Sequence, residues 1–310
     1  MVSRKCLIIP VHRPKAPWLI ALLNSIVANQ DAAPLPFDIV LATTNYSEYN
    51  YFANVINSLQ IAGKIRVVNP IGIISIDEYI KENLSFMHLL YNFRCNIDNA
   101  IINIKKFVSL YWAMKSGYDW AACIDCDAMA ISPLGDLFDI LLRNYETGQY
   151  FASHNNQRTA IDNIYASSRK MFAHTDQEKV EQLTCHGILF PWFFDMPIYN
   201  LADLGEFFDY MSVPHGSLEN WFVNLKWGTF DHIVYTYWRC LHKGAALIDY
   251  YDTLQIPHIT EELSTTELVR ISDKYGYAPV WMSAWEFSLG TAPLTELPNL
   301  CFVYHCDRFH

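Results

Sequence analysis

Two aspartates one residue apart are the clearest candidates for chemistry in the sequence. Asp125 and Asp127 flank Cys126 directly after the apolar run 120–124. On an extended strand, residues i and i+2 point to the same face, so the two carboxylates would repel each other unless a cation lies between them. Hard cations such as Mg²⁺ and Mn²⁺ take oxygen ligands and keep positions for phosphate oxygens and water. The pair therefore predicts a metal–diphosphate site, and two solvated acids in a turn are the alternative.

A second spacing near the aspartates, Cys123-x-x-Cys126, resembles a zinc or redox motif. A redox pair usually opens a helix, and a structural zinc site needs a second pair of ligands, which Cys185-His186 and Cys240-x-His242 do not obviously supply. The eight cysteines are scattered along the chain, which favours a reducing cytosol over a disulfide framework. The glycine-rich P-loop and dinucleotide motifs and the G-x-S-x-G motif do not occur.

The segments that must position the aspartates alternate between strand-like and helix-like patterns. The predicted strands are 5–9, 37–42, 65–68 and 120–124, and the predicted helices between them are 18–28, 48–60 and 105–116. Asn103 is expected to cap the last of these helices and Gly117 to end it. This order predicts an α/β fold with a parallel sheet and crossover helices. Ligands bind such sheets at the carboxyl ends of the strands, where Asp125 and Asp127 lie.

The second half of the chain is more aromatic and less regular. The expected elements are helices at 134–143 and 231–240 and strands at 150–153, 245–251 and 300–305. The polar segment 154–184 is expected to be a mobile loop or a helical insertion. The aromatic block 190–210 could form a platform for sugar rings or pack in the core, since aromatic side chains do both. Trp192, Tyr199 and Trp221 are the candidates for such a platform.

Composition narrows the function classes. The 310 residues include 32 acidic and 22 basic side chains, a net charge of −10, which argues against a broad nucleic-acid surface. The apolar run at the N-terminus is too short for a signal peptide, and no segment approaches the ~20 apolar residues needed to span a bilayer. We expect a cytoplasmic protein, with peripheral membrane contact at the cytosolic face left open because of the many aromatic residues. The oligomeric state is left open too.

Together these segments resemble a GT-A-type glycosyltransferase, the D-x-D-containing class that uses nucleotide-sugars. The likeness covers roughly residues 5–135, through the first strand with Pro10, the segment FDIVLATTN, the helix KKFVSLYWAMKSGY and the strand AACIDCDAMAIS. It implies a Rossmann-type mixed, mostly parallel sheet flanked by helices. Within one continuous domain, residues 1–135 would bind the nucleotide-sugar, and the aromatic-rich half 136–310 would bind the acceptor.

The resemblance also implies an activity. A sugar would pass from a nucleotide-diphosphate donor, UDP by default, to a hydroxyl of a glycan or glycolipid acceptor, as in polysaccharide biosynthesis. A sugar nucleotidyltransferase of similar fold and a non-catalytic carbohydrate-binding protein are the alternatives. The chain lacks the His-x-x-Gly-x-x-Lys signature of some relatives, so inversion and retention at the sugar both stay open.

The resemblance assigns roles to individual residues. Asp125 and Asp127 would contact the ribose and a Mn²⁺ or Mg²⁺ ion, and His305 would complete the ligand set of the metal. A neutral imidazole is a better ligand for Mn²⁺ than for Mg²⁺. Asp231 would deprotonate the acceptor, with Glu286 and Glu219 as alternatives. An ordinary acid in the first turn of a helix is the other interpretation of Asp231.

The nucleotide is expected at the ends of the first two strands. The residues predicted to contact it are Pro10, His12, Thr43, Asn45, Lys105 and Asp125. Lys106, Arg13 and Arg308 are further candidates for phosphate contacts, although each could equally be a surface cation.

Overall fold

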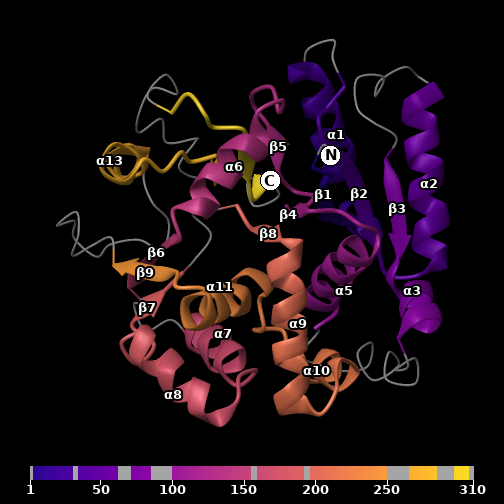
Figure 1. Ribbon diagram of the computed structural model, residues 1–310. Helices are drawn as coiled ribbons and strands as arrows, with labels where there is room; N and C mark the ends of the chain where they lie inside the picture. Colours follow the sequence, from indigo (N-terminus) through magenta and orange to yellow (C-terminus); the bar gives the residue numbers. More distant parts are fainter. Residues whose placement is uncertain are drawn as a thin grey trace.

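A five-stranded sheet forms the centre of the fold in the computed structural model (Figure 1). The structure describes residues 3–30, 34–61, 71–84, 100–154, 159–191, 196–249, 265–284 and 297–306. The strands of this sheet are β1 (Lys5–Pro10), β2 (Asp38–Thr43), β3 (Gly72–Ser75), β4 (Trp120–Cys123) and β8 (Ile198–Asn200). Their order is β3-β2-β1-β4-β8; the first four are parallel, and β8 runs antiparallel to β4. The predicted α/β class with a mostly parallel sheet is confirmed.

The central strand β1 pairs with β2 on one side and with β4 on the other, and the order of the strands reverses here. Ile8 of β1 lies opposite Val40 of β2 on one side and Cys123 of β4 on the other. The chain runs outward from β1 to β3 and then returns to place β4 on the other side of β1. Such a reversal of strand order is where ligands bind in open α/β sheets. The residues that follow β1 and β4 therefore meet at one edge.

Helices flank the sheet, and one of them, α5, carries the candidate residues Lys105 and Lys106. In Figure 1, α2 lies along the outer side of β3 with α3 below them, and α7 to α11 gather in the lower half of the view. The crossover elements are η1 (Arg13–Lys15), α1 (Ala16–Asn29), α2 (Tyr46–Ile61), α3 (Ile76–Asn83) and α5 (Ile101–Lys115). The predicted strand 65–68 lies outside the described residues, and the described strand that follows α2 is β3.

The predicted cap of α5 is wrong, and its side chain has another role. The helix begins at Ile101, so Asn103 lies inside the helix rather than before it. Asn103 is fully buried, and its Nδ2 donates to the carbonyl oxygens of Lys226 and Trp227 at 2.8 and 2.7 Å. These two bonds tie α5 to the loop that precedes α11 (Asp231–His242). A side chain that could cap a helix is used here for a contact from another part of the chain.

Two smaller sheets and a group of helices complete the second half. One sheet has the order β10-β11-β5 and the other β7-β6-β9. The strands are β5 (Met129–Ala130), β6 (Gln149–His154), β7 (Leu189–Phe190), β9 (Ala246–Asp249), β10 (Trp281–Ser283) and β11 (Phe302–Tyr304); the further helices are α6 (Leu137–Glu146), α7 (Thr159–Arg169), α8 (His174–Leu183), α9 (Leu201–His215), α10 (Leu218–Asn224) and α13 (Thr265–Tyr275). Within the polar segment 154–184, the described part is a helical insertion made of α7 and α8.

Aromatic side chains of the second half form much of the core. Tyr199 and Trp221 are buried, and Trp221 packs edge-on against Phe107 of α5 with ring centroids 4.7 Å apart. Phe207 of α9 stacks on the same Phe107 ring. Of the two interpretations of the aromatic block, core packing therefore holds for Tyr199 and Trp221. Trp192 lies outside the described residues.

Candidate functional site

A pocket of about 630 Å³ opens at the carboxyl ends of β1, β2 and β4. Ligand pockets commonly enclose about 300–1,000 Å³, so this one is large enough for a nucleotide-sized molecule. Its lining comes from the ends of three parallel strands and from the first turns of α5. The lining residues are Pro10, Val11, His12, Lys15, Thr44, Asn45, Glu48, Ile101, Ile102, Lys105, Asp125, Cys126 and Asp127.

Both carboxylates of the D-x-D pair line the pocket, and each is paired with a lysine from a different element. Asp127 is buried, and its Oδ2 lies 3.0 Å from Nζ of Lys15, where η1 leads into α1. Asp125 keeps 44% of its side chain exposed, and its Oδ1 lies 3.2 Å from Nζ of Lys106 on α5. Burial raises the pKa of Asp125, but the nearby Lys106 ammonium lowers it more, so the pKa stays below its ordinary value. Asp125 is therefore ionised at neutral pH.

The Lys106 ammonium lies between Asp125 and another carboxylate, which is buried beneath the pocket wall. Its Nζ also lies 3.7 Å from Oδ1 of Asp231, which is fully buried at the start of α11. The hydroxyl of Tyr199 on β8 donates a hydrogen bond to the same carboxylate. Burial lowers the pKa of Lys106, but Asp125 and Asp231 raise it more, so the ammonium stays charged. Lys106 is thus a fixed internal cation.

A second network surrounds Glu48 at the end of the pocket next to β2. Its carboxylate accepts a hydrogen bond from the backbone N–H of Thr44 at 2.9 Å and lies 2.8 Å from Nδ1 of His12. Nζ of Lys105, also buried, is 3.5 Å from Glu48 and donates to the carbonyl of Val11 at 2.6 Å. Burial raises the pKa of Glu48, but Lys105 and the hydrogen bonds lower it to about 2. The carboxylate is ionised and holds the loops after β1 and β2 together.

The C-terminal strand brings His305 to the same place. β11 pairs with β5, and the backbone N–H of Cys306 donates to the carbonyl of Asp127 at 2.9 Å. His305 has φ of 60°, a left-handed conformation that non-glycine residues seldom adopt and that often occurs at functional sites. A small cavity between the strands is lined by Asp125, Asp127 and His305 together.

The residue types of this group suit a divalent cation, but the ammonium groups stand in its way. Two carboxylates and an imidazole are an acceptable donor set for Mn²⁺. Within the described part of the chain, however, no three His, Cys, Asp or Glu side chains lie close enough together to hold a metal as they stand. Both carboxylates already attract cations, in the form of Lys15 and Lys106. The donor types therefore suit a divalent ion, which would have to compete with the ammonium groups for the two carboxylates.

Most of the predicted nucleotide contacts line the pocket, with one shift of register. Pro10, His12, Asn45, Lys105 and Asp125 all do so. Thr43 does not, because it still belongs to β2, where it is buried and donates its hydroxyl to the carbonyl of Ile74 at 2.9 Å. Its neighbour Thr44 takes the place at the pocket.

Two charged lining residues were missed from the sequence, Lys15 and Glu48. Lys15 follows Pro14 in a polar turn, where a lysine is ordinarily a surface cation. Glu48 lies at the start of an amphipathic helix, where an acid is favoured anyway. The parallel pairing of neighbouring strands was the available signal, because it brings the segments after β1 and β2 to the same edge as Asp127.

The predicted phosphate contact Arg13 points elsewhere. Its guanidinium donates to Ser47 and lies over the ring of Tyr51, 5.0 Å from the centroid. Arg308 lies outside the described residues.

The candidate catalytic acids differ in position. Asp231 does begin α11, as predicted, but it is fully buried and lies behind Lys106 rather than on the pocket wall. Glu219 is in the first turn of α10 and is not among the residues lining either cavity at the acid pair. Glu286 lies outside the described residues.

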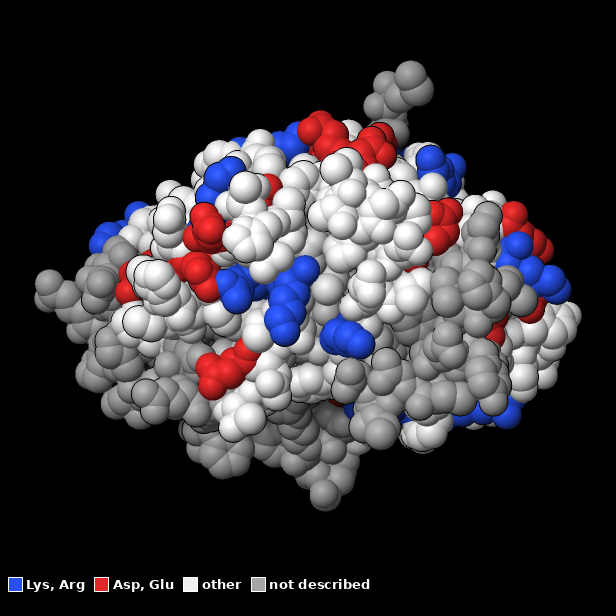
Figure 2. Space-filling view, turned by 90° about the horizontal axis from the view of Figure 1, so that it is seen from below, with Lys and Arg blue, Asp and Glu red and all other residues white. Residues whose placement is uncertain are grey.

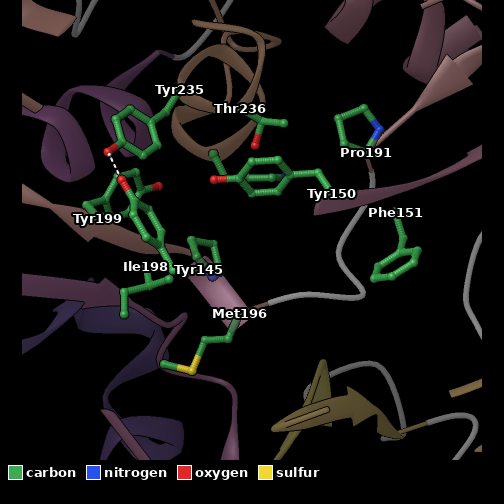
Figure 3. A pocket seen from close by; sticks show the side chains of 11 residues that line it. Tyr145, Tyr150, Phe151, Pro191, Met196, Ile198, Tyr199, Tyr235 and Thr236 are labelled. Carbon is green, nitrogen blue, oxygen red and sulfur yellow. Dashed lines mark hydrogen bonds between the residues drawn. The ribbon is translucent and has the colours of Figure 1, made fainter. Parts of the chain in front are cut away.

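A separate cavity beside α11 is too small for a sugar ring. It holds about 40 Å³, roughly the space of one water molecule. Figure 3 shows Tyr145 and Tyr235 meeting through their hydroxyl groups, 2.9 Å apart, at one side of it. Aromatic and apolar side chains make most of its wall: Tyr145, Tyr150, Phe151, Pro191, Met196, Pro197, Ile198, Tyr199, His232, Tyr235 and Thr236. It is a packing gap in the aromatic core.

The cysteines near the site are buried thiols without a disulfide. Cys123 and Cys126 are both free, and burial raises the pKa of Cys126 to about 12. A thiol with so high a pKa is a poor nucleophile and a poor metal ligand at neutral pH. The structure gives the C-x-x-C spacing no chemistry of its own.

Among the described residues on the face that Figure 2 shows, groups of Lys and Arg and groups of Asp and Glu lie scattered between wider neutral areas. Among the described residues, no helix is both long and apolar enough to cross a membrane.

Comparison with known proteins gives matches in structure only. No protein-family model and no curated protein sequence matches the chain. It is similar to the bifunctional glycosyltransferase WbbM (12% identity, TM-score 0.45), covering 98% of this chain but 46% of that one. It is also similar to mouse xyloside xylosyltransferase 1 (10%, TM-score 0.46, 98% of both chains) and to the galactosyltransferase LgtC in complex with donor and acceptor sugar analogs (12%, TM-score 0.41, 97% and 87%). All three are glycosyltransferases, the class that the sequence resembles.

Proposed function

We propose that the protein transfers a sugar from a nucleoside-diphosphate donor to a hydroxyl group of an acceptor, with a divalent cation at Asp125 and Asp127. The observation that carries the proposal is the position of this acid pair in a nucleotide-sized pocket at the switch point of a mostly parallel sheet. Nucleotides bind at such points, and the strand ends supply both the wall and the charges.

The residues of the pocket divide its tasks by place. His12, Thr44 and Asn45 follow β1 and β2 and would surround the nucleoside. Glu48 and Lys105 hold these two loops in position through their ion pair and the bond to Val11. The base and ribose would thereby be fixed relative to the acid pair before any bond breaks.

The diphosphate would lie between the acid pair and the lysines. Asp125, Asp127 and His305 are the residues that would hold the cation; when bound, it neutralises charge on the leaving diphosphate. Lys106 adds a fixed positive charge behind this position. We propose Asp231 as a positioning residue that holds the Lys106 ammonium, because its burial separates it from the pocket.

The acid pair is tested by Asp127→Asn. A screen of nucleotide-sugars with Mn²⁺ first identifies a donor, since a ligand at 100 times its Kd raises stability by about 2.7 kcal/mol. With that donor, Asp127→Asn should lower turnover by at least about a hundredfold while the protein keeps its fold, because the cation loses its buried ligand. Asp139→Asn is the matched control, since Asp139 is an exposed acid paired with Lys5. Full turnover by Asp127→Asn, with or without Mn²⁺, would remove the proposal.

A further inference from the structure

The two lysines on the acid pair differ in how firmly they are held. Lys106 is buried, with 6% of its side chain exposed, and its ammonium lies between Asp125 and Asp231. Lys15 keeps 39% of its side chain exposed, and its ammonium lies 3.0 Å from Asp127 at the pocket wall. A partly exposed ion pair of this kind shifts an equilibrium only about two- to fivefold, because water screens it and the long side chain loses freedom. Of the two cations, Lys15 is the one that can be displaced.

The charges of the pocket indicate what displaces it. Among the described residues, the two ammonium groups of Lys15 and Lys106 face the three carboxylates of Asp125, Asp127 and Asp231, so no surplus positive charge is present. A nucleoside diphosphate would bring further negative charge into that site. A divalent cation held by the two carboxylates would compete with Lys15 for Asp127, and a released Lys15 ammonium would already lie on the wall of the pocket proposed for the phosphates. An ammonium is a compact charge that pairs well with phosphate oxygens.

We propose that Lys15 is a donor-binding residue that competes with the divalent cation for Asp127 and binds the diphosphate once it is displaced. This inference rests on the proposed function, since it assigns a role in the same pocket. It predicts two effects of opposite sign when the ammonium is removed. The cation alone binds more tightly because its competitor is gone. The nucleoside diphosphate binds more weakly because it loses a charged partner.

The geometry of the chain makes this exchange local. Lys15 is the last residue of η1 and stands at the N-terminus of α1, directly after the loop that follows β1. β1 pairs with β4 in parallel, so the loops after the two strands leave the sheet side by side. Lys15 can therefore turn from Asp127 to a ligand in the pocket by rotating its own side chain, with the backbone of both loops in place.

The test compares wild type with Lys15→Met. Binding of Mn²⁺ alone is followed by the loss of its free-ion EPR signal, and binding of UDP or GDP with saturating Mn²⁺ by calorimetry. Mn²⁺ affinity should rise about three- to tenfold, because a competing positive charge at contact distance is removed. Nucleotide affinity should fall about ten- to hundredfold, the usual effect of losing one charged hydrogen bond. Lys15→Gln is the second neutral variant and should change both affinities in the same directions.

Two controls separate this role from a general effect of charge or stability. Lys179→Met removes the same charge from a partly exposed ion pair with Asp176 on α8, and it should leave both affinities unchanged. Lys15→Arg keeps the charge, so its Mn²⁺ affinity should not exceed that of wild type. Thermal unfolding without ligand confirms that each variant folds.

The outcomes are distinct from those of the proposed function. If the neutral Lys15 variants bind Mn²⁺ no more tightly than wild type, or bind UDP and GDP equally well, the exchange is wrong. Suppose that wild type transfers sugar but the neutral Lys15 variants have the same Mn²⁺ and nucleotide affinities as wild type. That result would overturn this inference and leave the proposed function standing. Opposite shifts of the two affinities in a protein that transfers no sugar from any donor would support the exchange and remove the proposed function.

Discussion

Replacing Lys106 with Met tests whether the buried cation holds the site together. The substitution keeps an unbranched side chain of similar length but removes the charge between Asp125 and Asp231. Asp125 is 44% exposed and can be solvated, so the cost falls mainly on Asp231, which is fully buried. Removing one partner of a buried ion pair usually costs about 3–5 kcal/mol. Because Tyr199 still donates to Asp231, we expect a loss near the lower end of that range, about 3 kcal/mol.

A double-mutant cycle with Asp231→Asn measures the pair itself. The double variant removes both charges, so it should be more stable than Lys106→Met alone, with a coupling free energy of at least about 1.5 kcal/mol. Urea denaturation followed by tryptophan fluorescence and circular dichroism gives the free energies of unfolding. Lys115→Met on the exposed end of α5 is the control and should change stability by less than about 0.5 kcal/mol. A loss below about 1 kcal/mol in Lys106→Met, or no rescue by Asp231→Asn, would refute the reasoning.

Two further predictions concern the contacts that hold the pocket in shape. The pKa of Glu48 is lowered from 4.5 to about 2, so its stabilising effect is complete above pH 4.5 and disappears as the pH falls towards 2. Glu48→Gln should therefore lower the free energy of unfolding by roughly 3 kcal/mol at pH 7 and by much less at pH 3, as urea denaturation at the two pH values will show. Asn103→Ala removes the two hydrogen bonds from the buried Asn103 side chain to the carbonyls of Lys226 and Trp227, at a cost of about 1–3 kcal/mol in the same assay. Equal stability of Asn103→Ala and wild type would contradict that role.

The strands of the central sheet could be predicted because each is a short apolar run that ends at a turn signal. β1, β2 and β4 fall within one residue of the predicted ranges 5–9, 37–42 and 120–124. Their parallel order followed from the helices between them. The position of Asp125 and Asp127 at the rim of the sheet followed in turn, because it depends on one strand and the residue after it.

Contacts between distant segments could not be predicted in the same way. Asn103 has the right residue type and place for a helix cap, but carbonyls at 226 and 227 bind it instead. Lys15 and Asp127 are 112 residues apart in the sequence, and a local sequence pattern cannot predict a contact over that separation. Thr43 and Thr44 are chemically equal, and only the end of the β2 ladder decides which of them faces the pocket.

The arrangement of charges explains how so acidic a chain can offer a place to a diphosphate. The net charge is −10, yet each carboxylate at the pocket is matched by a lysine within 4 Å: Glu48 by Lys105, Asp125 by Lys106 and Asp127 by Lys15. Because the three lysines come from α5 and from the start of α1, they converge on the strand ends only when the sheet and its helices are assembled. The positive charge is thus a product of the fold, and under the proposed exchange a divalent cation in place of Lys15 would add positive charge where the phosphates are proposed to bind.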